Sequence, residues 1–113
     1  MNSKQKGGVG VAAAISYFAK RGDLVYSPIT ESGCDLIIDR GGRLLRVEVK
    51  SSWHKKGIVD LRNSSGYYTA KGVSQPVFDG HSVDILVAYN GDTDSIQEFK
   101  SVDMHGRSTV TVR

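Results

Sequence analysis

The sequence has very little cysteine and proline, and it has no long apolar run. Of its 113 residues only one is a cysteine, Cys34, so an internal disulfide is excluded. The three histidines are scattered along the chain, and together with one cysteine they make no zinc-ligand spacing. The longest apolar run, residues 9–15, is far below the ~20 residues that span a bilayer, so we expect no membrane segment.

We also expect no secretory leader, because the lysines near the N-terminus are not followed by an apolar stretch. We therefore expect an intracellular protein in a reducing compartment. A hydrophobic content of 39% with 24% charged residues is typical of a globular protein and excludes a mainly disordered chain. Without repeats or a linker, residues 1–113 are expected to form a single domain.

The net charge of +3 is small, but the charges are unevenly distributed. Residues 40–62 carry seven basic side chains against two acids, whereas residues 79–103 carry six acids against one base. The basic segment suggests a partner that bears phosphate, with the acidic segment turned away from it. The alternative, that both segments are ordinary solvated faces, stays open on charge alone.

Apolar spacing predicts one helix followed by several strands. Val11, Ala14, Ile15 and Phe18 make one helical stripe that ends at Gly22, with residues 1–8 as a frayed lead-in. Residues 63–82 are expected to be a loop with at most one short helix. The predicted strands cover residues 24–27, 35–39, 43–52, 58–62, 83–89, 96–99 and 109–112, which indicates an α/β fold with strands in the majority.

One group of residues stands out as a candidate for chemistry. A hairpin turn at Gly41-Gly42 places Asp35 opposite Glu48, while Glu48 and Lys50, two residues apart, project from the same face of their strand. Two carboxylates suit Mg²⁺, and a lysine beside them can orient the attacking water. The group is therefore suited to metal-assisted phosphodiester hydrolysis. The alternative is a solvated strand face that carries opposite charges.

These residues resemble the PD-(D/E)XK nuclease core: Gly33-Cys34-Asp35 is followed across a hairpin by Glu48-Val49-Lys50, with Cys34 where the proline would stand. The glycine-rich residues 6–10 before an apolar helix extend the resemblance. The layout is most similar to the small branch of group I intron homing endonucleases, and next to archaeal Holliday-junction resolvases.

The resemblance implies an αβββαβ core with a mixed central sheet and an N-terminal helix. It also implies cleavage of DNA with Mg²⁺, for which Mn²⁺ is expected to substitute. Asp35 and Glu48 would be the metal ligands and, with Lys50, the catalytic residues. An intracellular protein encoded by a phage or mobile element would fit this family.

The sequence departs from the family at two positions. Val11 stands where the first helix often carries a glutamate, which puts a second metal in doubt and leaves reduced activity open. Glu48 stands where the homing branch often has glutamine, and it could restore the charge missing at Val11.

Several polar and basic side chains are candidates for contacts with DNA. Trp53 either stacks on DNA or is a half-buried anchor, and Tyr67-Tyr68 is more typical of packing. The candidate set is Arg43, Arg46, Ser51, Ser52, Trp53, His54, Lys55, Lys56 and Lys71.

The leading interpretation is a Mg²⁺-dependent DNA endonuclease that acts as a homodimer or higher homo-oligomer, because one small chain presents a single site. Linear duplex and four-way junction both remain open as the substrate. One rival is a nucleic-acid-binding module that keeps the nuclease fold with a weak or inactive site. A weaker rival is an unrelated β-rich domain whose basic stripe binds a protein.

Overall fold

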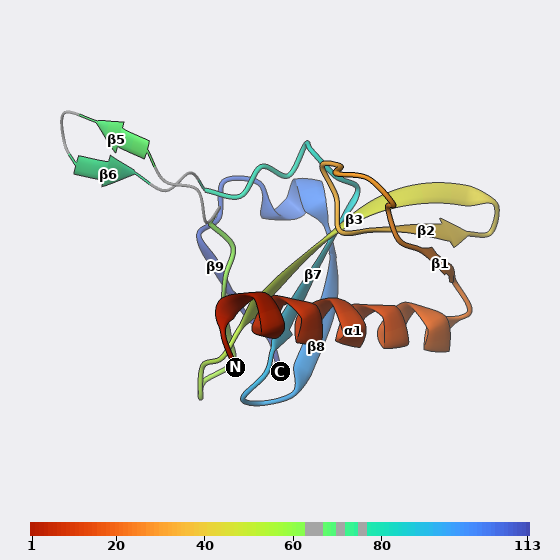
Figure 1. The fold of residues 1–113 in the computed structure, drawn as a ribbon, viewed down its shortest axis with the longest axis horizontal. Helices are drawn as coiled ribbons and strands as arrows, with labels where there is room; N and C mark the ends of the chain where they lie inside the picture. The colour runs from red at the N-terminus through yellow and green to blue at the C-terminus, as the bar shows by residue number, and fades with distance from the viewer. Residues whose placement is uncertain (63–66, 70–71, 75–76) are drawn as a thin grey trace.

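The computed structural model describes residues 1–62, 67–69, 72–74 and 77–113. No helix in these ranges is long and apolar enough to cross a membrane. The elements, in chain order (Figure 1), are α1 (Ser3–Arg21), β1 (Leu24–Tyr26), β2 (Leu36–Arg40), β3 (Arg43–Ser52), β4 (Ile58–Asp60), β5 (Tyr67–Thr69), β6 (Gly72–Ser74), β7 (Ile85–Asn90), β8 (Ser95–Lys100), the 3₁₀ helix η1 (Ser101–Met104) and β9 (Thr109–Thr111).

Helix α1 begins much earlier than the frayed lead-in predicted for residues 1–8. Asn2 and Gln5 form a capping box: the side chain of each accepts a hydrogen bond from the backbone N–H of the other, at 2.9 Å in both cases. At the other end Gly22, with a φ of 90°, caps the helix as predicted. The prediction of fraying was wrong because this cap satisfies donors that would otherwise be exposed at the helix end.

The buried face of α1 is rotated relative to the predicted stripe. Its buried residues are Gly10, Ala14 and Phe18, whereas Ile15 is 40% exposed. A side chain at Gly10 would overlap the Ser51 hydroxyl of β3, so the helix backbone lies directly against that strand. The close approach at Gly10, together with the burial of Phe18, turns this face rather than Ile15 toward the sheet.

The main sheet has five strands in the order β1-β2-β3-β7-β8, and it is mixed because only β3 and β7 are parallel. Gly41 and Gly42 both have positive φ, as a two-residue hairpin between β2 and β3 requires. The register runs from Arg40 opposite Arg43 to Leu36 opposite Val47, which is the predicted register. This hairpin therefore brings Asp35, just before β2, to the level of Glu48.

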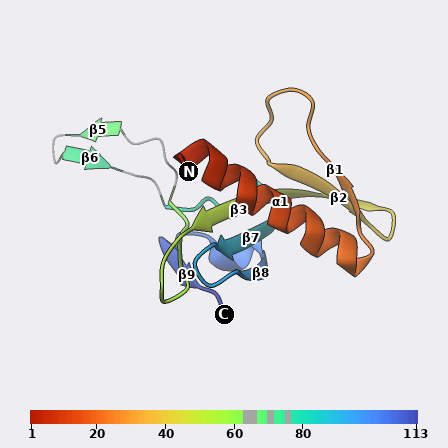
Figure 2. The same ribbon diagram turned by 60° about the horizontal axis from the view of Figure 1, so that its bottom comes forward.

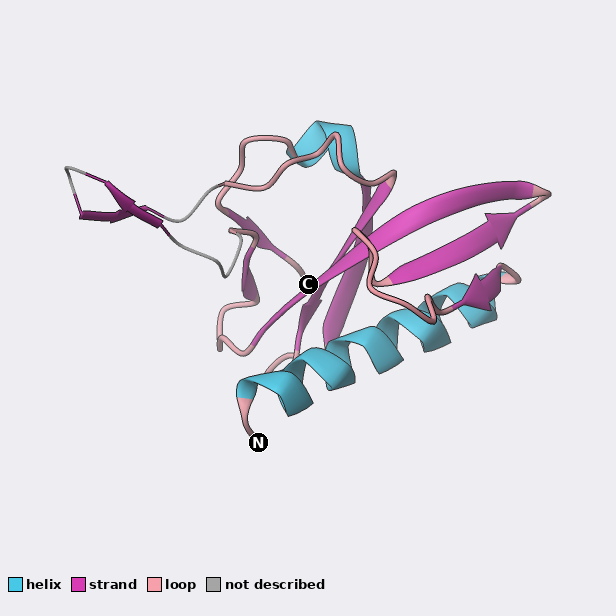
Figure 3. Cartoon of the chain, turned by 45° about the horizontal axis from the view of Figure 1, so that its top comes forward, coloured by secondary structure: helices cyan, strands magenta, loops and turns pink. Residues whose placement is uncertain are grey.

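Two apolar cores lie on the two sides of this sheet. Between α1 and the sheet, Phe18 packs with Ile38, Val47 and Val87. The other core lies where β4 pairs with β9 and η1 packs, and Figures 2 and 3 show α1 and η1 on opposite sides of the strands. All six residues of β7 are buried, because alternate side chains enter the two cores.

The α/β class with a mixed sheet and an N-terminal helix is confirmed. The second helix of the αβββαβ layout does not occur in the described parts of the chain. Within residues 63–82, which were predicted to be a loop with at most one short helix, β5 and β6 pair as antiparallel strands. The short helix η1, which no sequence signal predicted, follows β8 directly.

Candidate active site

Asp35 is held at the point where β2 separates from β3. Its backbone N–H donates to the carbonyl of Val47 (2.9 Å), and its carboxylate Oδ2 accepts from the N–H of Val49 (2.7 Å). If β2 extended further, one of its backbone carbonyls would accept the hydrogen bond from the Val49 N–H. The Asp35 carboxylate accepts that hydrogen bond instead. The side chain is exposed, and Oδ1 accepts no hydrogen bond from the part of the chain that the structure describes.

Glu48 and Lys50 project from the same face of β3 and form an ion pair. The distance from Lys50 Nζ to Glu48 Oε1 is 3.5 Å, and both side chains are mostly buried, at 25% and 16% exposed for Glu48 and Lys50. Lys50 also donates from Nζ to the carbonyl of Arg62 (3.3 Å). Two acceptors therefore orient the ammonium, which leaves one of its three N–H groups for a ligand.

The electrostatics of Glu48 favour a bound cation. Burial raises the pKa of Glu48, the Lys50 ammonium opposes this, and the carboxylates of Asp35 and Asp79 raise the pKa further. The net effect is a pKa above the ordinary value for a glutamate. A cation between Asp35 and Glu48 would relieve the repulsion of the carboxylates, so the site is electrostatically suited to one.

Asp60 fixes the segment that holds Lys50. Its carboxylate accepts from Arg62 Nη2 (2.8 Å) and Nε (3.0 Å), and its backbone N–H donates to the Ser52 hydroxyl (2.9 Å). The Arg62 guanidinium lowers the pKa of Asp60 through these bonds. The sequence analysis missed Asp60, because its part depends on how β4 is placed beside β3.

The residues present fit a divalent cation held by two carboxylates. Asp35 and Glu48 offer hard oxygen ligands, and Mg²⁺ is commonly bound by one or two carboxylates together with waters and phosphate oxygens. Within the described ranges, no cluster of three His, Cys, Asp or Glu side chains could hold a metal ion. Helix α1 adds no acid, because its residue 11 is a partly buried valine that packs against the core.

The residues after Lys50 form the wall next to the first turns of α1. Trp53 is half-buried, with its ring edge-on to Tyr89 at 6.1 Å between centroids and its indole packed against Gly91. The Lys6 ammonium lies over the Trp53 ring, 5.3 Å from its centroid. The sequence analysis also missed Lys6, since only the folded helix places it beside residues 51–54.

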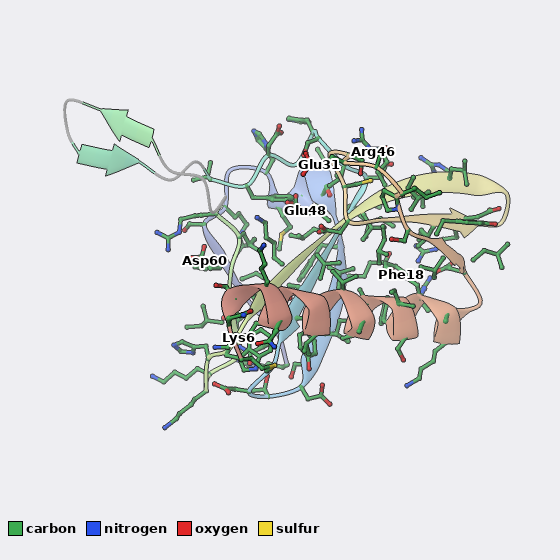
Figure 4. All side chains as sticks on the ribbon, viewed as in Figure 1. Lys6, Phe18, Glu31, Arg46, Glu48 and Asp60 are labelled. Atoms are coloured by element: carbon green, nitrogen blue, oxygen red, sulfur yellow. The ribbon has the colours of Figure 1, made fainter. Side chains whose placement is uncertain are left out.

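The other candidates for DNA contacts are dispersed. His54, Lys55 and Lys56 lie in the exposed loop between β3 and β4, whereas Lys71 lies outside the described residues. Arg46 is exposed on the face of β3 that carries Glu48 (Figure 4). Arg43 begins β3 beside the hairpin turn, about 17 Å along the strand from Glu48 at ~3.3 Å per residue, so it lies apart from the site.

The expectation that residues 79–103 turn away from the site was wrong for two of its acids. Asp79 is close enough to Glu48 to raise the pKa of that residue. Asp84 lies directly beside β3, since its Oδ2 accepts from the backbone N–H of Arg46 (2.8 Å). The parallel pairing of β3 with β7 places Asp84 beside β3, and charge counting along the chain does not predict such a pairing.

Comparisons with known proteins agree with this geometry. A family model described as PD-(D/E)XK endonuclease matches residues 1–113. Among solved structures, the chain is similar to a bacterial homing endonuclease, I-Ssp6803I, with 29% sequence identity and a TM-score of 0.79. This similarity covers 100% of the chain and 79% of the other. Comparison with curated protein sequences gives no match.

Proposed function

Because this chain belongs to the PD-(D/E)XK endonuclease family, we propose that it is a DNA endonuclease that hydrolyses phosphodiester bonds with Mg²⁺. The observation that carries the proposal is the convergence of Asp35, Glu48 and Lys50 at the end of the β2–β3 hairpin. We further propose that residues 1–113 act as one nuclease domain and that Mn²⁺ substitutes for Mg²⁺.

In the proposed mechanism Asp35 and Glu48 would hold a divalent cation, which when bound would supply charge neutralisation at the scissile phosphate and a lowered pKa of water. Lys50, oriented by Glu48 and the Arg62 carbonyl, directs its remaining N–H toward the attacking water and keeps it in line with the phosphorus. Arg46, on the same face, is suited to a neighbouring phosphate.

We propose that the substrate is duplex DNA rather than a four-way junction, since the similar solved structure is that of a homing endonuclease. A chain with one site cuts both strands most simply as a symmetric homo-oligomer, in which two-fold-related sites face the two strands. Sedimentation velocity tests this: the protein should sediment as a dimer or larger assembly, and a stable monomer on cleaved DNA would contradict it.

A second candidate function is DNA binding with weak or absent cleavage. The observation that favours it is Val11, which packs in the core and leaves two carboxylates to hold the cation. The two candidates differ in one measurable respect, because a binding module would retain DNA without cutting it at any metal concentration.

Plasmid, linear duplex and four-way junction DNA incubated with Mg²⁺, Mn²⁺ or EDTA test these proposals together. We expect metal-dependent cleavage that each of Asp35→Ala, Glu48→Ala and Lys50→Ala reduces by about 10²-fold or more. Lys20→Ala, at the far end of α1, is the control and should cut normally. Cleavage in EDTA, or near-normal cutting by Glu48→Ala, would overturn the mechanism, and binding without cleavage would support the second candidate.

A further inference from the structure

A pocket of about 510 Å³ opens beside Lys50, between the first turns of α1 and residues 49–54. Its volume lies within the ~300–1,000 Å³ of typical ligand pockets. Lys50 belongs both to this wall and to the candidate catalytic group. A DNA strand whose scissile phosphate faces Lys50 would therefore continue along the pocket.

The charges on the pocket wall favour an anion. Among the described residues that line it, Asp60 is the only acid, and Arg62 neutralises that carboxylate at 2.8 Å. Lys50 is paired with Glu48. Lys6 differs, because among the described residues no carboxylate lies within 4.0 Å of its ammonium. The wall thus keeps one cation without a counter-ion.

Trp53 positions the Lys6 ammonium through its ring face, so the N–H donors of Lys6 remain available for a ligand. The Lys6 ammonium lies over the Trp53 ring, which is itself held by Tyr89 and Gly91, so the long lysine side chain is directed toward the pocket. His54 adds a donor: its Nδ1 accepts from the Lys56 N–H (3.1 Å), which leaves the proton of the neutral ring on Nε2.

We infer that this pocket binds the phosphate next to the scissile one on the cleaved strand, with Lys6 as its main contact and Trp53 as the residue that positions Lys6. This inference rests on the proposed nuclease function and extends the DNA-binding surface to α1. It assigns a role to Lys6, which lies outside the strands and loops that carry the other candidates.

DNA binding measured in EDTA separates this inference from catalysis. Log affinity falls as log salt rises, and Lys6→Ala should make this fall less steep by about 0.9, the value for one phosphate contact. The control Lys20→Ala should leave the steepness unchanged. Trp53 is the only tryptophan, so its fluorescence should change when DNA fills the pocket. An unchanged slope for Lys6→Ala would overturn the inference.

Neutral methylphosphonate linkages, placed one at a time along the strand, locate the contact. The linkage beside the cleavage site should weaken binding of the wild-type protein several-fold and should not weaken Lys6→Ala further. Equal sensitivity of both proteins at that position would overturn the assignment.

Trp53→Phe should keep the salt dependence of the wild-type protein, whereas Trp53→Leu should make it less steep. Circular dichroism should confirm that both variants fold. The same salt dependence in the two variants would overturn the positioning role of Trp53. Failure of the wild-type protein to bind DNA would overturn the proposed function and this inference together. Normal binding and cutting by Lys6→Ala would overturn this inference alone.

Discussion

At the scale of single residues, Val11 decides how many carboxylates the site contains. It lies in α1, at the position where the resemblance of the sequence suggested a glutamate, and it is partly buried and packs against the core between α1 and the sheet. We expect Val11→Glu to lower the free energy of unfolding by about 1–3 kcal/mol, because a carboxylate would lose hydration there. Urea unfolding measures the loss.

Val9→Glu is the matched control for this prediction, since Val9 lies on the same helix and is more exposed. It should change stability little. Calorimetric titration with Mg²⁺ completes the test: tighter Mg²⁺ binding by Val11→Glu at unchanged stability would mean that the helix supplies a ligand position rather than a packing position.

At the scale of elements, the contact between α1 and β3 depends on the absence of a side chain at Gly10. A methyl group there would overlap the Ser51 hydroxyl, whereas one at Gly7 would have no atom within 4 Å. We expect Gly10→Ala to destabilise the protein by about 1–3 kcal/mol through overpacking. Gly7→Ala should stabilise it by ~0.5–1 kcal/mol through helix propensity.

Thermal unfolding of both variants measures this difference, and Gly10→Ala at least as stable as the wild-type protein would contradict the packing. The double variant Gly10→Ala/Ser51→Gly should recover part of the loss. Since Ser51 follows Lys50 directly, we expect Gly10→Ala to disturb the site as well as the helix.

The elements that local chemistry specifies were predictable from the sequence. The Gly41-Gly42 turn set the hairpin register, and alternation along residues 43–52 identified the faces of β3, so Asp35, Glu48 and Lys50 could be placed together. The helix start was not predictable in the same way, and the buried face was predictable only in part. The predicted stripe contained the buried residues Ala14 and Phe18, but Gly10 is buried because it has no side chain, and a hydropathy stripe does not detect this.

Contacts distant in sequence explain the remaining differences. The carbonyl of Arg62 reaches Lys50 because β4 pairs with β9, about fifty residues later in the chain, and Asp84 reaches Arg46 because β7 is parallel to β3. No local period encodes either pairing. The family, however, was predictable, because its defining motif, Asp35 with Glu48-Val49-Lys50, is short and lies on the β2–β3 hairpin. The match of the family model over residues 1–113 confirms the prediction.

At the scale of the whole molecule, one cluster of ion pairs ties together three parts of the fold. Arg40 of β2 donates to both carboxylate oxygens of Asp23, which follows α1, and to both of Glu98 in β8, at 2.9–3.0 Å. The hydroxyl of Tyr17 also donates to Glu98 (3.2 Å). The Asp23 side chain is 6% exposed, so this arginine neutralises charge that is largely removed from water.

The cluster predicts how stability depends on pH. Hydrogen bonds from Arg40 lower the pKa of Asp23 and of Glu98, despite burial, which acts in the opposite direction. The unfolded chain therefore takes up protons at a higher pH than the folded chain. The stabilisation should be complete above the ordinary carboxyl range, near pH ~4, and should be lost as the pH falls through the lowered pKa values.

Urea unfolding of the wild-type protein between about pH 2.5 and 7 should show this loss. In Glu98→Gln the decline below pH ~4 should be shallower, because the substitution removes one of the two titrating groups, while Asp92→Asn, at an exposed turn, should follow the wild-type curve. Arg40→Met should cost about 2–4 kcal/mol at neutral pH, since it removes the cation that donates to both carboxylates and leaves only the more exposed Arg21 beside them. A wild-type pH dependence in Glu98→Gln would mean that other carboxylates control acid unfolding, and the cluster would then contribute packing alone.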